Sequence, residues 1–175
     1  MHRWLMSLLA LVTLSLGVDR PVLAQFNLFG RSVDTIDTKE LNEMLSKAQR
    51  AREAAVAKGD AQAPSTDFVL VDVRSENETG VSVIPGAITL KQFEANKEQY
   101  RQRLVIPYCT VGGRSGSYAK QLEKDGFEVK NYKGSILEWI KHDLPLVTLK
   151  GEPTRQVHTY DKRYRVPAGY QQVIR

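Results

Sequence analysis

The sequence predicts an α/β fold, an open and mainly parallel sheet with helices on both faces. Two apolar, β-branched runs at 68–73 and 104–108 lead to this prediction, together with the helix-forming segments that alternate with them. Runs that stay apolar on consecutive residues are typical of strands buried on both faces of a parallel sheet. The composition agrees, because 175 residues with 42% hydrophobic and 26% charged content fall in the globular range. In such folds the functional residues are expected beyond the carboxyl ends of the strands.

The first predicted element is a helix that begins near Lys39. Asp37 or Thr38 can cap its N-terminus, and Glu40 stands where a capping box places an acidic residue. The segment is rich in helix formers up to Gly59, where the helix is expected to end. We therefore predict a helical lead-in and linker over residues 25–66, ahead of a core over 67–148.

The core is predicted as alternating strands and helices. The segment 84–88 indicates a turn into a short strand, and the polar segment 91–102 indicates a helix. A strand over 104–108 leads into a helix from about Arg114 to Asp125 that stops at Gly126. A third long strand is predicted over 127–132. The remaining residues, 149–175, form a basic C-terminal tail.

The N-terminus has the features of a secretory signal peptide over residues 1–24. Basic Arg3 precedes an apolar stretch from Trp4 to Val18, and the small residues Val22 and Ala24 fit a cleavage site before Gln25. An uncleaved anchor is the alternative, but this stretch is short for a stable membrane span, and we expect none. We therefore expect an exported protein, which in a bacterium means a periplasmic one.

The positive charge is concentrated at the C-terminus. The chain carries a net charge of +5, and residues 149–175 hold six Lys or Arg against two Asp or Glu. A near-neutral body argues against nucleic-acid binding, which calls for a basic face on the folded domain. Tyr160, Tyr164 and Tyr170 lie among the tail cations, so the tail either contacts a partner protein or anionic surface, packs across its own domain, or is mobile.

The candidate catalytic residue is Cys109, the single cysteine of the chain, which follows the 104–108 strand. The loop after it and the start of the next helix comprise the candidate substrate-binding residues Thr110, Val111, Gly112, Gly113, Arg114 and Ser115. Glycines let the backbone N–H groups of such a loop turn inward, and the helix N-terminus adds positive potential. These groups and the Arg114 charge are expected to lower the thiol pKa and make Cys109 a nucleophile at neutral pH. A buried structural cysteine is the alternative reading.

These motifs resemble those of the rhodanese-like domain family over roughly residues 37–147. Four motifs match in order: Asp72-Val73-Arg74 with Glu78; Ile84-Pro85-Gly86-Ala87; Tyr108-Cys109 with Gly112, Arg114 and Ser115; and Gly126-Phe127 through Gly134, Trp139 and Leu144-Pro145. The resemblance implies a single-domain sulfurtransferase, in which the cysteine takes sulfane sulfur from a donor as a persulfide and passes it to a thiophilic acceptor.

The expected substrates are a small anionic donor such as thiosulfate, drawn by Arg114, and a thiol or cyanide-like acceptor. Asp72, Arg74 and Glu78 are expected to support the loop through a charge network, with Glu78 as the partner of Arg74. We expect no cofactor and no metal, because one cysteine cannot build a thiolate cage and no carboxylate pattern accompanies the histidines. His142 and His158 are expected at the surface.

Three positions depart from the family pattern. Val83 replaces a histidine, Thr79 replaces an aromatic residue, and Ser135 replaces the second glycine of a Gly-Gly pair. The loop length is that of sulfur-transfer members, whereas the related phosphatases have one residue more, which disfavours a phosphatase. Because a fold does not fix a function, the alternative is a rhodanese-like binding or sulfur-carrier module without turnover, in an exported multiprotein pathway.

Overall fold

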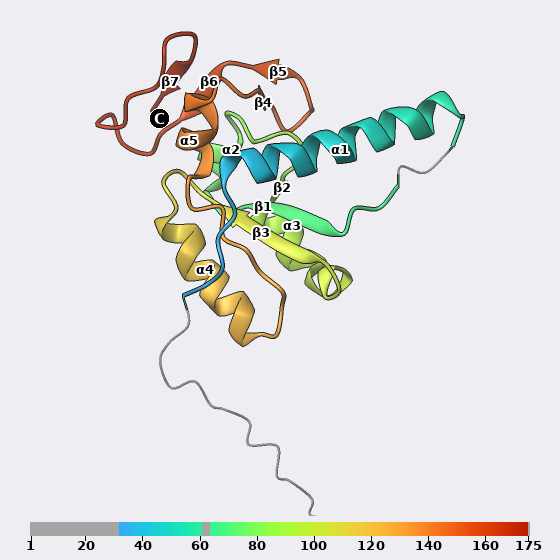
Figure 1. Cartoon of the computed structure of the whole chain (residues 1–175). Coiled ribbons are helices and arrows are strands. Elements are labelled where there is room, and N and C mark those ends of the chain that lie inside the picture. The colour runs from blue at the N-terminus through green and yellow to red at the C-terminus, as the bar shows by residue number, and fades with distance from the viewer. Residues whose placement is uncertain (1–31, 61–63, 175) are drawn as a thin grey trace, which may run out of the picture. The chain divides into compact units, whose positions relative to one another are not determined.

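The computed structural model describes residues 32–60 and 64–174 (Figure 1). The predicted signal peptide, residues 1–24, lies outside the described residues, as does the first part of the lead-in at 25–31. In chain order the elements are α1 (Thr38–Ala57), β1 (Phe68–Asp72), α2 (Glu76–Thr79), β2 (Ile88–Thr89), α3 (Leu90–Ala95), the 3₁₀ helix η1 (Lys97–Tyr100), β3 (Leu104–Tyr108), α4 (Gly113–Lys124), α5 (Ser135–Lys141), β4 (Leu146–Val147), β5 (Pro153–Thr154), β6 (Gln156–His158) and β7 (Gln171–Val173). Within the described ranges, no helix has the length and apolarity needed to span a bilayer.

The central sheet is parallel, with β1 between β2 and β3. Val71 is in register with Ile88 on one side, and Val69 with Val105 on the other. The side chains of β1 alternate between two cores: Phe68 and Leu70 face one, whereas Val69 and Val71 face the other. The strand is therefore buried on both faces, as its nearly continuous apolar run predicts.

Helices cover both faces of this sheet, so the predicted fold class is confirmed. Leu41 of α1 and Ile136 of α5 lie in one core, while Phe93 of α3 and Leu122 of α4 lie in the other. Figure 1 shows α1 on one side of β1 and β3 and α4 on the opposite side. Asp37 caps α1 by accepting a 2.8 Å hydrogen bond from the N–H of Glu40, as expected from the sequence.

The predicted long strand over 127–132 is wrong. The segment lies beside β3 and makes only isolated bridges, which pair Val129 with Val105 and Asn131 with Thr35. Val105 donates to the carbonyl of Glu128, and Tyr132 donates to the carbonyl of Pro107. Pro107 has no N–H to donate in return, so the ladder lacks the bond that would join these contacts into a strand.

The single helix predicted over 91–102 is also wrong in part, because the structure has two shorter helical elements in this region. Helix α3 ends at Ala95, and η1 follows after Asn96, whose φ of −129° is not helical. The Asn96 side chain donates a 3.0 Å hydrogen bond to the carbonyl of Gln92. An asparagine that bonds nearby backbone competes with helical hydrogen bonding, which accounts for the break.

The C-terminal segment packs on the same body. Val157 and Tyr170 are buried in the core that contains Ile136, and the Tyr170 hydroxyl donates a 2.6 Å hydrogen bond to the carbonyl of Leu144. Strands β4 and β5 pair antiparallel, whereas β6 and β7 pair parallel. Of the alternatives for the tail, packing across its own domain is therefore observed for these residues. The division of the chain near residues 66 and 148 stays a prediction.

Candidate functional site

The Cys109 loop connects the end of β3 to the start of α4, where the sequence places it. Its sharp turn requires glycine at Gly112, where φ is +91°. A Cβ atom built there would lie 2.2 Å from the carbonyl oxygen of Lys133, so even the smallest side chain is excluded. Gly113 differs, because nothing lies within 4 Å of a Cβ at that position. Only the first of the two glycines is sterically required.

The thiol of Cys109 lies inside this turn and is 1% exposed. Its Sγ accepts a hydrogen bond from the N–H of Gly112 at 3.1 Å. Burial raises the pKa of the Cys109 thiol, but hydrogen bonds from the N–H and hydroxyl of Ser115 and from the N–H groups of Val111 and Gly112 outweigh burial and lower it. The thiolate is thus stabilised mainly by backbone and hydroxyl donors of the loop.

Arg114 faces Glu78 and forms a two-pronged ion pair with it. Both Nη atoms lie 2.7 Å from the two carboxylate oxygens. Arg114 also donates to the Thr110 hydroxyl at 2.8 Å, and that hydroxyl donates to Glu78 at 3.1 Å. Burial alone would raise the pKa of Glu78, but hydrogen bonds from Arg114 and from the N–H and hydroxyl of Ser75 lower it to about 2. Glu78 is therefore ionised at neutral pH and compensates the charge of Arg114.

This pairing corrects the expectation that Glu78 is the partner of Arg74. Glu78 is brought to the loop by the short helix α2, whose N-terminus Ser75 caps. Because the charge of Arg114 is compensated, its role in drawing an anionic donor stays a prediction. Glu78 does contact the loop, through Thr110 and Arg114, as a supporting residue would.

Arg74 pairs instead with Asp72, and both side chains are fully buried. Nε and Nη2 of Arg74 donate to the carboxylate, with the shortest distance 2.6 Å. Nη2 also donates to the carbonyl of Ser82 at 2.6 Å. Burial lowers the pKa of Arg74, but the Asp72 carboxylate outweighs burial and raises it. Since Asp72 is in register with Tyr108, this pair anchors the strand end that precedes Cys109.

Ser135 is a site residue that the sequence reasoning missed. Its Oγ accepts a hydrogen bond from the N–H of Cys109 at 3.0 Å and lies 3.9 Å from the sulfur. The residue has a left-handed φ of +58°, which a glycine would adopt without strain. The signal in the sequence is the departure from the Gly-Gly pair of the family pattern at this position. The serine keeps a strained backbone and adds a hydroxyl beside the sulfur.

The start of α5 supports the other side of the loop. The N–H of Ile136 donates to the carbonyl of Cys109 at 3.1 Å, and that of Leu137 donates to the carbonyl of Thr110 at 3.3 Å. These bonds connect the loop to a segment more than 20 residues further along the chain. The loop carbonyls therefore point toward α5, which leaves the loop N–H groups free to face the sulfur.

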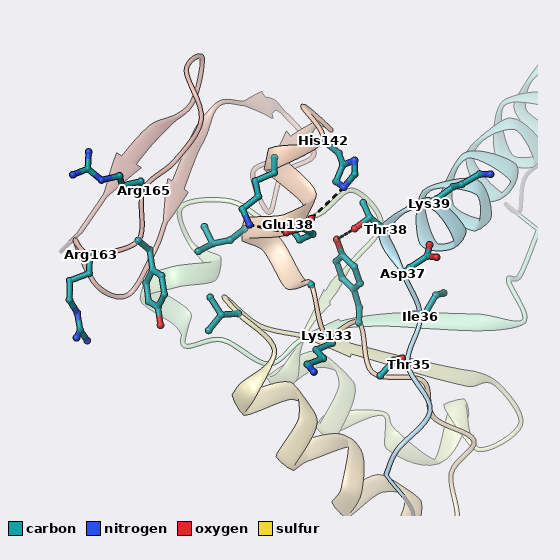
Figure 2. Close-up of a pocket in the computed structure, with 16 residues that line it drawn as sticks. Thr35, Ile36, Asp37, Thr38, Lys39, Lys133, Glu138, His142, Arg163 and Arg165 are labelled. Carbon is teal, nitrogen blue, oxygen red and sulfur yellow. Dashed lines mark hydrogen bonds and ion pairs between the residues drawn. The ribbon is translucent and has the colours of Figure 1, made fainter.

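A groove of about 990 Å³ begins beside the loop (Figure 2). Val111, which is 46% exposed, lines it together with residues of α1, α5 and the C-terminal segment, but Cys109 does not. The basic side chains around the groove do not point toward one common place. Figure 2 shows that Arg163 and Arg165 extend away from Lys133 and Glu138. Glu138 is already paired with Lys141 at 2.9 Å. In the described part of the chain, no group of three or more His, Cys, Asp or Glu is arranged to hold a metal ion.

Comparison with known proteins gives a match to a protein family and to several relatives. The family model described as "Rhodanese-like domain" matches residues 53–142. The chain is 33% identical over 93 residues to a sulfurtransferase of Allochromatium vinosum, which covers 51% of this chain and 87% of the relative. It is 29% identical over 148 residues to a tRNA uridine(34) hydroxylase of Shouchella clausii, covering 78% of this chain but only 42% of that protein. The crystal structure of a rhodanese-related protein from Thermoplasma volcanium is similar over 65% of this chain and 97% of that chain, with 20% identity and a TM-score of 0.48.

Proposed function

The chain belongs to the rhodanese-like domain family, and we propose that it is an exported sulfurtransferase that acts through a persulfide on Cys109. One observation carries the proposal: a buried thiol whose pKa is lowered lies among inward-facing donors of the loop. A thiolate is the form of cysteine that attacks sulfur, and fixed N–H donors stabilise negative charge on the sulfur that is added. The relative named sulfurtransferase supports the same reaction class.

The proposed reaction has two displacements. In the first, the Cys109 thiolate attacks the outer sulfur of thiosulfate, an S–S bond forms, the S–S bond of thiosulfate breaks, and sulfite leaves with the electron pair. In the second, a thiolate or cyanide attacks the outer sulfur of the persulfide, and the Cys109 thiolate leaves with the electron pair. The negative charge of the loop sulfur is retained throughout, so donors that stabilise the thiolate also stabilise the persulfide.

The same proposal assigns roles to the loop residues. Thr110, Val111, Gly112, Gly113 and Ser115 surround the outer sulfur, while Asp72, Arg74 and Glu78 support the loop from the neighbouring segments. Arg114 is the one cation of the loop. Because it is paired with Glu78, an anionic donor that binds Arg114 has to approach it beside that carboxylate. Export through residues 1–24 is part of the proposal and rests on the sequence pattern alone.

The test is the intact mass of the purified protein before and after thiosulfate, with Cys109→Ser as the control. We expect wild type to gain the mass of one sulfur atom, the gain to be removed by cyanide, and the serine variant to gain nothing. Absence of any gain in wild type with a reduced, alkylatable Cys109 would refute the proposed reaction.

A second candidate is a sulfur carrier or binding module that receives sulfur from a protein rather than from thiosulfate. The compensated charge of Arg114 favours it, because the loop then offers no unpaired cation to a small dianion. The two candidates separate when a protein persulfide donor replaces thiosulfate: a carrier loads sulfur only from the protein donor. Export is checked separately, by N-terminal sequencing of the protein from the cell envelope fraction, where the first residue should be Gln25.

A further inference from the structure

The C-terminal segment, which lies beyond the family match at 53–142, contributes a side chain to the cluster beside Cys109. The guanidinium carbon of Arg114 lies 5.3 Å from the centre of the Tyr160 ring. This is within the range of a cation–π interaction. The Tyr160 side chain is otherwise open to solvent, since the residue is 68% exposed. A large aromatic residue on the surface is thus held against the cation of the site.

Tyr160 has an unusual backbone for such a residue. Its φ of +66° lies in the left-handed region, which a bulky side chain adopts only when the surroundings hold it there. Its N–H donates to Nδ1 of His158 at 3.1 Å. Nε2 of Gln172 donates to the hydroxyl of the neighbouring Thr159 at 2.6 Å and to the carbonyl of Tyr164 at 2.7 Å. His158 is buried, contrary to the expectation of a surface histidine, because it forms part of this support.

The ring covers a charged pair that joins the two ends of the catalytic loop. Glu78 binds Arg114, which lies at the end of the loop, and also Thr110, which follows Cys109 directly. Arg114 remains 41% exposed along its side chain, so water competes for its hydrogen bonds. A ring on the guanidinium favours its present position without using any of the donors that contact Glu78 and Thr110.

We propose that Tyr160 is a positioning residue of the sulfur-transfer site, which holds Arg114 on Glu78 and thereby fixes the loop backbone around Cys109. As a role in sulfur transfer, this inference rests on the proposed function. The effect on the thiol itself does not, because it follows from the contacts of the loop. Loss of the ring lets Arg114 leave Glu78 more often, so the loop N–H groups are aligned with the sulfur for less of the time.

The test compares Tyr160→Ala, Tyr160→Phe and Tyr160→Gly with wild type. Phenylalanine keeps the ring and should behave as wild type. Alanine and glycine both remove the ring, but only glycine also relieves the left-handed backbone, so an effect shared by both belongs to the ring. Leu149→Ala is the matched control, because it removes an exposed apolar side chain, 53% exposed, from the same C-terminal segment outside the cluster.

The first readout is the rate of Cys109 alkylation by iodoacetamide as a function of pH. An exposed cation–π contact corresponds to about a two- to fivefold change in an equilibrium. We therefore expect the pH midpoint of alkylation to move upward by about 0.3 to 0.7 units in Tyr160→Ala and Tyr160→Gly, which corresponds to this two- to fivefold change. The second readout is the rate constant of sulfur loading from thiosulfate. It should fall by the same factor in Tyr160→Ala and Tyr160→Gly, while Tyr160→Phe and Leu149→Ala remain at the wild-type value.

Equal pH midpoints in wild type, Tyr160→Ala and Tyr160→Gly would overturn the inference. A shift in Tyr160→Ala that Tyr160→Gly does not share would overturn it too, because the backbone and not the ring would then be responsible. The alkylation assay needs no turnover. If wild type takes up no sulfur while the ring-deleted variants still shift the midpoint, the proposed function fails and the positioning of the loop by Tyr160 stands.

Discussion

Substituting Gly112 by alanine adds a methyl group where the carbonyl oxygen of Lys133 already lies. The added Cβ would be 2.2 Å from that oxygen, and the backbone would also keep a φ of +91°. The left-handed conformation costs a non-glycine residue about 1–3 kcal/mol, and a forced shift of packed backbone costs about 1–3 kcal/mol more. We therefore expect Gly112→Ala to lower the free energy of unfolding by about 2–6 kcal/mol.

Gly113→Ala is the matched control at the next residue. A Cβ there meets nothing within 4 Å, and Gly113 is the first residue of α4, so alanine should be neutral or stabilise by up to about 1 kcal/mol. Urea unfolding gives both values, and thermal unfolding should show a loss of roughly 6–18 °C for Gly112→Ala. The same variant should load sulfur far more slowly, because the Gly112 N–H would no longer face Sγ. Equal stability of the two alanine variants would refute the steric argument.

Three further predictions concern residues around the sulfur. Cys109→Ser should abolish sulfur uptake and leave the melting temperature within a few degrees of wild type, as read by intact mass and thermal unfolding. Glu78 has a pKa lowered from its ordinary value of 4.5 to about 2, so the folded state binds the proton more weakly than the unfolded chain. The stability that the ionised Glu78 contributes is present above about pH 4.5 and is lost as the pH falls toward 2. Urea unfolding across this range should show a smaller loss of unfolding free energy for Glu78→Gln than for wild type. Identical slopes of unfolding free energy against pH in the two proteins would contradict the assignment. Ser135→Ala and Ser135→Gly both remove the acceptor of the Cys109 N–H, but only glycine relieves the φ of +58°. The glycine variant should therefore be more stable than the alanine variant by about 1 kcal/mol. Equal stability of the two variants would show that the backbone at this position is unstrained.

The sequence was sufficient for the elements whose signals are local. The apolar run of β1 and the helix that stops at Gly126 are both found, because burial on two faces and a left-handed glycine leave patterns in consecutive residues. For the segment 127–132 the sequence does contain a sign that the pairing is incomplete, because Pro107 in the neighbouring strand cannot donate one of the ladder hydrogen bonds. Nothing in 91–102 marked the break at Asn96 as clearly.

The partners within the site were not predictable in the same way. Glu78 could pair with Arg74 or with Arg114 from their order along the chain, and only the position of α2 beside the loop selects Arg114. The contact of Tyr160 with Arg114 joins residues 46 positions apart through the C-terminal segment, for which the family resemblance gave no expectation. Long-range pairs of this kind depend on packing that no local pattern records.

The burial of Cys109 also determines which chemical damage the protein resists. A disulfide between two copies requires their Cα atoms to come within about 7 Å of each other, and a sulfur that is 1% exposed inside a turn cannot reach another chain without local opening. A small oxidant needs much less opening of the loop than a second chain does, so it reaches the thiolate more easily. In an oxidised preparation, Cys109 should therefore be present as sulfinic or sulfonic acid rather than as an intermolecular disulfide, and thiol reductants would not restore it.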